Sequence, residues 1–202
     1  MAASIPLYQV AFGTLARILT TTHDILSKAK ETHPNLIPSL PRIRLYEDMN
    51  PLYYQVQTVC NFAHTLASRL TTPTATSFAP LHGWEKYDEE TITVDQLLEK
   101  IAIAREVLAK VTPEKVAEAV VAAAKDAEEK KTKTYAISNP EPRPSFAFDA
   151  SQFVLGYVLP NSYFHMNILY AILRKEGVPL GKADYLTPFL KEAVVGTWGT
   201  SH

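Results

Sequence analysis

The sequence DASQFVLGYVLPNSYFHMNILYAILRK, residues 149–175, predicts the last long helix of this protein. It opens with a capping box, in which the side chains of Asp149 and Gln152 each accept a hydrogen bond from the other residue's backbone N–H. Apolar side chains then recur at helical spacing, until Gly177 and Pro179 end the pattern. We therefore expect one amphipathic helix across the whole stretch.

The rest of the chain shows the same helical periodicity. Amphipathic patterns cover residues 8–29, 50–70 and 93–111. The segment 112–131 is rich in alanine and is expected to be peripheral, because small side chains bury little area. Together with residues 149–175, these patterns predict an all-α fold, a four-helix bundle with one extra peripheral helix.

Local signals refine this outline. His33 precedes a proline and should end the first helix, since that position disfavours the α conformation. Asn50 is expected to cap the second helix, with Pro51 in its first turn. Short alternating stretches at 133–137 and 145–148 predict a β-hairpin.

The domain organisation follows from length and loops. With 202 residues, the chain is expected to form a single domain, residues 1–202. Residues 71–92 are rich in threonine and proline but also aromatic, which favours a loop that folds back over the bundle as a lid. Residues 71–92 and 187–202 are interpreted as elaborations of the bundle.

The composition excludes several functional classes. The net charge of −1 gives no electrostatic case for a nucleic-acid or acidic-membrane partner. A single cysteine, Cys60, excludes an internal disulfide framework and a cysteine-rich zinc site. The first residues do not resemble a signal peptide, and uninterrupted apolar runs are too short for a membrane helix, so a cytoplasmic location is expected.

Two polar residues interrupt the apolar face of the helix at 149–175. Asn161 and His165 lie one turn apart on that face. One interpretation is structural: the two side chains bond each other or a backbone carbonyl near Pro160. The other is functional: they line a pocket between helices, where an imidazole can transfer protons near neutral pH. The sequence leaves both open.

Several motifs give the chain a recognisable signature. It resembles domain-of-unknown-function family nineteen ninety-three, found in bacteria and fungi, and through it the DinB/YfiT-like superfamily of four-helix bundles, which are often dimeric. The resemblance rests on PNSYFH (160–165), YAILR (170–174), GVPLGK (177–182), DYL (184–186), DM (48–49), PL (51–52) and QVQ (55–57).

The resemblance implies a position for a metal site. Many superfamily members bind a divalent metal through three histidines, one on the second helix and two at i, i+4 on the last. The pattern places His165 at one of these positions, Asn161 at another and Gln57 near the third. Amide oxygens are weak ligands for zinc, so no cofactor is predicted, and the set Gln57, Asn161 and His165 is a weak alternative.

Three functional hypotheses follow. In the first, His165 is the acid/base residue of an inter-helix pocket that binds a small metabolite for isomerase, dehydratase or cyclase chemistry. Its ligand-binding residues are expected to be Asn161, Gln55, Gln57 and Tyr163. The second is a metal-dependent transferase or hydrolase, and the third a non-catalytic interaction module. A homodimer is expected, and whether the chain is an enzyme stays open.

Overall fold

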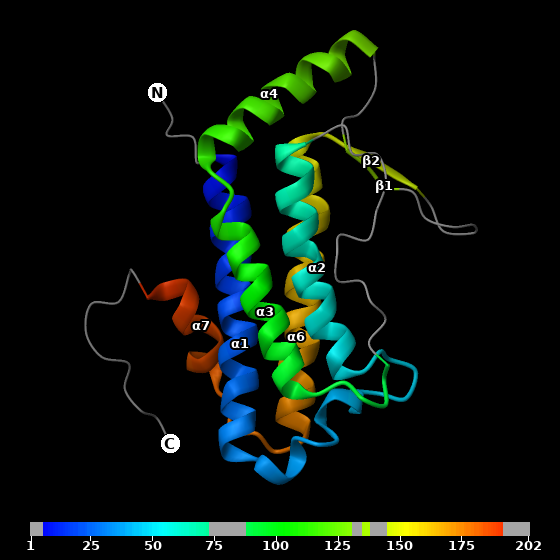
Figure 1. Ribbon diagram of the computed structural model, residues 1–202, viewed down its shortest axis with the longest axis vertical. Coiled ribbons are helices and arrows are strands. Elements are labelled where there is room, and N and C mark those ends of the chain that lie inside the picture. Colours follow the sequence, from blue (N-terminus) through cyan, green and yellow to red (C-terminus); the bar gives the residue numbers. More distant parts are fainter. Residues whose placement is uncertain (1–5, 73–87, 131–134, 138–144, 192–202) are drawn as a thin grey trace.

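Four long helices pack side by side as a bundle (Figure 1). The computed structural model describes residues 6–72, 88–130, 135–137 and 145–191. α2 contacts both α3 and α6, and α1 contacts the same two helices, so α1 and α2 occupy opposite corners. The predicted all-α four-helix bundle is confirmed. Its helices are α1 (Thr14–Thr32), α2 (Leu52–Thr71), α3 (Val94–Ala109) and α6 (Leu159–Lys175).

The core lies between these four helices. It consists of the apolar positions of the predicted stripes, and each fully buried leucine or isoleucine stabilises the fold by about 1.5–3 kcal/mol. Completely buried examples are Leu15, Ile18, Leu66, Ile101 and Ile172.

The first helix begins with a π-turn and ends before a proline. The π-helix η1 (Gln9–Gly13) continues directly into α1. α1 ends at Thr32, and His33 leaves the helical conformation (φ −133°, ψ 58°) just before Pro34. The predicted end of this helix is confirmed.

The start of α2 differs from the prediction. Pro51, in an extended conformation (φ −69°, ψ 171°), is the N-cap, and no side chain caps the helix. The prediction of Asn50 as the cap is wrong, because the extended proline moves the helix start one residue further on. The backbone carbonyl of Asn50 instead accepts a hydrogen bond from the Gln55 side chain.

The connections on either side of α2 are unlike each other. The short 3-10 helices η2 (Pro34–Leu36) and η3 (Leu40–Arg42) link α1 to α2. Between α2 and α3, residues 73–87 lie outside the described part of the chain, and with them most of the predicted lid. α3 then begins with the predicted capping box of Thr93 and Gln96.

A further helix and a hairpin lie at one end of the bundle (Figure 1). α4 (Pro113–Lys130) runs across that end and is mostly exposed, as expected for the peripheral helix. β1 (Tyr135–Ile137) pairs antiparallel with β2 (Phe146–Phe148). The hairpin is confirmed, with strands shorter than predicted.

The segment 149–175 is helical throughout but not uniformly wound. It comprises α5 (Ala150–Gln152), the π-helix η4 (Phe153–Val158) and α6. The capping box of Asp149 and Gln152 is confirmed. Pro160 has no N–H to donate, and π-turns commonly insert where a helix must accommodate such a break. The π-turn therefore changes which side chains of the segment share a face.

α7 (Lys182–Leu190) packs against α1. Lys28 Nζ on α1 lies 2.7 Å from Asp184 Oδ1, and the other Asp184 oxygen accepts from the Gly181 backbone N–H at 2.7 Å. The sequence also suggests an ion pair between Arg174 and Asp184. That prediction is wrong: Arg174 donates to the Val178 carbonyl.

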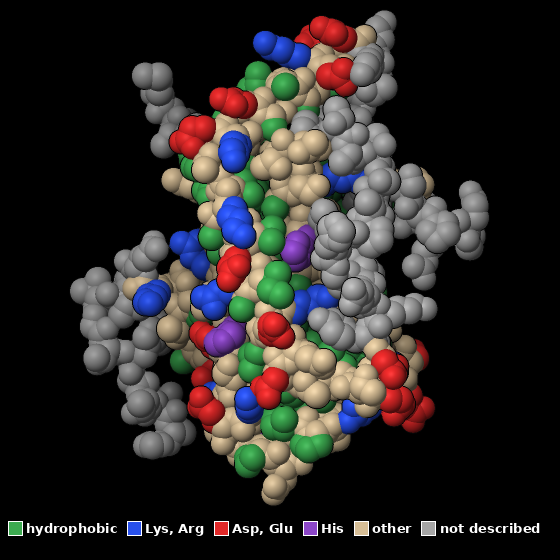
Figure 2. All heavy atoms as spheres, in the orientation of Figure 1, with side chains coloured by type: hydrophobic (Ala, Val, Ile, Leu, Met, Phe, Trp, Pro, Cys, Tyr) green, Lys and Arg blue, Asp and Glu red, His purple; other side chains and the backbone are tan. Residues whose placement is uncertain are grey.

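The described surface mixes charges of both signs. Figure 2 shows basic and acidic side chains interspersed over the face in view, in keeping with the net charge of −1. No described helix combines the length and apolar character needed to cross a membrane.

Candidate functional site

His165 lies half-buried at the seam between α2 and α6. Its ring nitrogen Nδ1 is 2.7 Å from Oε1 of Gln55 on α2. The two residues therefore join the helices through a single hydrogen bond between side chains.

A second bond fixes the orientation of the Gln55 amide. Gln55 Nε2 donates to the backbone carbonyl of Asn50 at 2.8 Å, just before α2 begins. A carbonyl only accepts, so the NH₂ group of Gln55 must face Asn50 and its oxygen must face His165. The oxygen in turn accepts, which assigns the proton to Nδ1 of His165. Nε2 is then the unprotonated ring nitrogen.

Burial sets the charge state of this histidine. Loss of hydration lowers the pKa of His165 from 6.5 to about 4. The imidazole is therefore neutral at neutral pH. In this state Nε2 offers a lone pair, and the ring supplies no extra proton to a ligand.

Aromatic rings flank the imidazole. Tyr54 on α2 meets it edge-on at 6.0 Å between ring centres, and Phe164 lies nearly perpendicular at 5.3 Å. Phe164 is 55% exposed, so its apolar ring faces solvent beside the histidine. Tyr157 lies near Tyr54, and both burial and that neighbour raise the pKa of its phenol. The neighbourhood thus combines one polar acceptor with apolar rings.

Asn161 satisfies its own helix instead of His165. Its Nδ2 donates to the Tyr157 backbone carbonyl at 2.7 Å. A structural role of this kind, a bond to a backbone carbonyl, was one of those considered for Asn161 from the sequence, but the acceptor is the carbonyl four residues earlier and not the one that Pro160 leaves without a donor. The amide oxygen of this half-buried side chain remains the group that it can offer to a ligand.

Gln57 and Tyr163 point elsewhere. Gln57 is buried on α2, but two residues correspond to about 200° around a helix, so it lies on the side away from Gln55. Tyr163 stacks on Phe189 of α7, with ring centres 6.0 Å apart. Of the predicted site residues, the structure brings together Gln55 and His165.

The residues present do not fit the metal site that the resemblance implies. Gln57 lies on the side of α2 away from Gln55, which is the residue that His165 of α6 contacts, and Asn161 donates to the Tyr157 carbonyl of its own helix. Among the described residues, no three histidine, cysteine or acidic side chains cluster closely enough to hold a metal ion.

The lone cysteine is not part of this site. Cys60 is fully buried, and burial raises the pKa of its thiol to about 12. A buried thiol of this kind is inert as a nucleophile.

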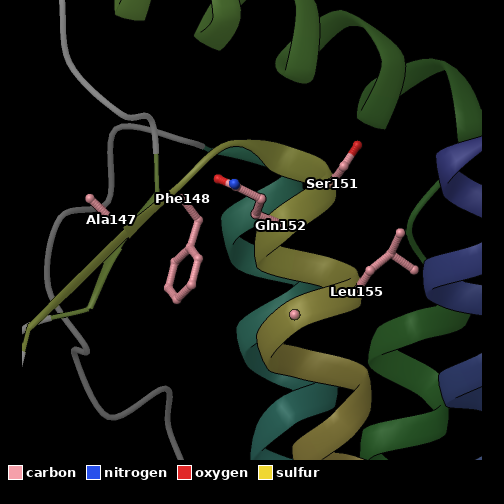
Figure 3. Close-up of a pocket in the computed structure, with 6 residues that line it drawn as sticks. Ala147, Phe148, Ser151, Gln152 and Leu155 are labelled. Atoms are coloured by element: carbon pink, nitrogen blue, oxygen red, sulfur yellow. The ribbon is translucent and has the colours of Figure 1, made fainter.

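A depression of about 580 Å³ lies away from His165, beside the hairpin (Figure 3). Strand β2 and the helical turns of α5 and η4 line it, and none of the lining residues is charged. They are Ala147, Phe148, Ser151, Gln152, Leu155 and Gly156.

Two features of the site could not be read from the sequence. Helical spacing put Gln55 on the right helix but did not pair it with His165. The Asn50 carbonyl is a backbone group, which no side-chain pattern reveals.

Comparison with known proteins places the chain in a family. No curated protein matches it. A crystal structure of a DinB family member from Shewanella denitrificans is similar, with a TM-score of 0.66 and 28% identity over 89% of this chain and 91% of that one. The family model for the domain of unknown function DUF1993 matches residues 7–186. The chain therefore belongs to the DUF1993 family, with the bundle fold of a DinB-like protein.

Proposed function

We propose that this protein binds a small metabolite at the α2–α6 seam and that the neutral imidazole of His165 accepts a proton from it. The observation that carries the proposal is the chain of bonds from the Asn50 carbonyl through Gln55 to His165. This chain fixes the tautomer in which Nε2 is free to accept.

The chemistry follows from that tautomer. Nε2 takes a proton from a ligand O–H or activated C–H, while Nδ1–H stays bonded to Gln55. Because burial disfavours the imidazolium, the proton is returned quickly to the ligand, at the same or another atom. Moving a proton between two atoms of one molecule is the step that isomerases, dehydratases and cyclases share.

The surroundings indicate the kind of ligand. Tyr54 and Phe164 offer apolar ring surface beside the imidazole. A ligand with a hydroxyl or amide donor next to an apolar part would satisfy both, which is typical of small-molecule sites. The Asn161 amide oxygen supplies a further acceptor on the same edge of α6.

A metal-dependent reaction is the less favoured candidate. A histidine that donates Nδ1–H to an amide is oriented as metal ligands usually are. However, no group of three histidine, cysteine or acidic side chains forms at His165 within the described residues. Elemental analysis of protein purified without chelator tests this: less than one equivalent of metal, unchanged in Asn161→Ala, removes the candidate.

The direct test is a thermal-shift screen of metabolites on the wild-type protein. A ligand at 100 times its Kd adds about 2.7 kcal/mol to the free energy of unfolding. A hit should lose its shift in His165→Ala and keep it in His23→Ala, whose ring contacts Asp24 on α1. Folded His165→Ala with unchanged binding would rule the proposal out.

The predicted homodimer is tested in the same samples by sedimentation velocity.

A further inference from the structure

A row of buried polar side chains runs along one edge of α2. Asn61, Thr65 and Arg69 are spaced by four residues, so they follow one another on adjacent turns. Their exposed fractions are only 6%, 7% and 4%. Polar groups at this depth normally have hydrogen-bond partners.

Arg69 lacks such partners within the part of the chain that the structure describes. There, both terminal nitrogens of its guanidinium, Nη1 and Nη2, are buried without a hydrogen bond. Burial lowers the pKa of Arg69, and the described group that acts on it electrostatically is the Tyr135 phenol. A guanidinium nevertheless keeps its charge in proteins. Arg69 is therefore a buried cation without a described counter-charge.

Tyr135 on β1 is the second orphan. It is 1% exposed, its ring stacks on Phe153 with ring centres 5.0 Å apart, and its hydroxyl has no hydrogen-bond partner among the described residues. Burial raises the pKa of this phenol to about 12, so it remains protonated. The phenol and the Arg69 guanidinium interact electrostatically.

Among the described residues, the buried side-chain atoms without a hydrogen bond share one chemical property. They are Asn61 Nδ2, Arg69 Nη1 and Nη2, and the Tyr135 hydroxyl, and all of them donate. Asn61 lies eight residues before Arg69, about 12 Å along the helix axis, so it is not counted in the same site. Buried donors beside a positive charge are complementary to an acceptor with negative charge. An unpaired buried ion costs several kcal/mol, which such a ligand would offset.

We propose that Arg69 and Tyr135 bind the carboxylate group of a small organic acid. The two Nη atoms form a fork that matches both carboxylate oxygens, and the phenol adds a third donor. Charge favours a carboxylate over a phosphate. One carboxylate neutralises one guanidinium, whereas a phosphate group carries about −1.5 to −2 at pH 7 and would leave excess negative charge in a buried site.

This site is distinct from the seam at His165. Arg69 lies 14 residues after Gln55 on α2, which corresponds to about 21 Å along the helix axis. A small metabolite cannot span that distance. The bound acid would instead connect α2 to the hairpin, because its two anchors come from α2 and β1.

The experiment compares salts at equal ionic strength. Wild-type protein is dialysed into chloride buffer, and its Tm and binding heat are measured with sodium acetate, sodium phosphate and sodium chloride. The variants are Arg69→Met, Tyr135→Phe and the control Arg105→Met, which removes the same charge from an exposed position of α3.

We expect acetate to raise the Tm of the wild type and of Arg105→Met, with a smaller effect of phosphate. Arg69→Met should weaken acetate binding at least about tenfold, and Tyr135→Phe should weaken it less. In chloride alone, Arg69→Met should be at least as stable as the wild type, because it removes an unpaired buried charge.

Three results would overturn the proposal. The first is no acetate effect on the wild type. The second is an acetate effect that Arg69→Met and Tyr135→Phe both retain, or that phosphate exceeds. The third is an Arg69→Met protein much less stable than the wild type in chloride, which would show that the guanidinium already has a partner within the chain.

Discussion

His165 and Gln55 are 110 residues apart in the chain, yet a 2.7 Å hydrogen bond joins their side chains across the α2–α6 seam. The bond does two things at once. It links two helices of the bundle, and it determines which imidazole nitrogen carries the proton. The predictions about His165 depend on this pair.

The first prediction concerns the charge of the histidine. Gln55→Glu replaces the accepting amide oxygen with a carboxylate and should raise the pKa of His165 well above 4, because an adjacent negative charge favours the imidazolium. The shift is measured by NMR titration of the ring C–H signals. Asn167→Asp is the matched control. It adds a charge to α6, the helix that carries His165, at a position about 200° around the helix from His165.

The control variant should leave the His165 titration close to that of the wild type. An equal shift in both variants would mean that the effect is general electrostatics. No shift in Gln55→Glu would mean that the bond does not form in solution.

The second prediction concerns stability against pH. The pKa of His165 is about 4 in the folded protein and 6.5 when unfolded, so the unfolded chain binds more protons between these values. The free energy of unfolding should therefore fall as the pH is lowered from about 6.5 to 4. Because the ring is only half-buried, we expect the loss to be roughly 1–3 kcal/mol.

Urea denaturation across this pH range checks the prediction, with His165→Gln as the comparison. The variant should lose that part of the pH dependence. His64 contributes in the same direction, since burial and Lys100 lower its pKa, and its share remains in the variant. Parallel curves for the two proteins would contradict the assignment to His165.

Helical periodicity was enough to predict the bundle. Each of the four core helices is at least 16 residues long and carries an apolar stripe. Two of the four predicted segments begin with a capping box, and the structure contains both boxes. Such signals are local, because they depend on residues within a few turns of each other. The hairpin was predicted for the same reason.

The site was harder to predict because it depends on contacts between elements. One turn of spacing put Asn161 and His165 on the same face, but the Asn161 side chain bonds the Tyr157 carbonyl of its own helix instead. Gln57 has the same amide side chain as Gln55, but it lies about 200° around α2 from Gln55 and so does not face His165. The buried donors of Arg69 and Tyr135 come from α2 and β1, so only the arrangement of these two elements in the fold reveals them.

A third prediction concerns the thiol. Cys60 is completely buried and the pKa of its thiol is raised to about 12, so it should not react with iodoacetamide in native protein at pH 8. Mass spectrometry should show full alkylation once the chain is denatured. Rapid modification of native protein would mean that the α2 face carrying Cys60 opens readily to solvent.

The last prediction concerns the attachment of α7. Asp184 bonds Lys28 on α1 and the backbone N–H of Gly181, and these bonds outweigh desolvation to lower its pKa. Removing the carboxylate in Asp184→Ala should therefore cost about 1–2 kcal/mol, since charge-assisted bonds to partly buried groups exceed surface pairs. Asp95→Ala, which breaks the exposed pair with Lys30, should cost less than about 1 kcal/mol. Urea denaturation of both variants, from neutral pH down into the acidic range, decides the matter. The cost of Asp184→Ala should shrink as the pH falls through the lowered pKa of Asp184, because protonation removes the charge that Lys28 pairs with. A cost that stays the same down to acidic pH would show that packing, and not the charge, holds α7 on α1.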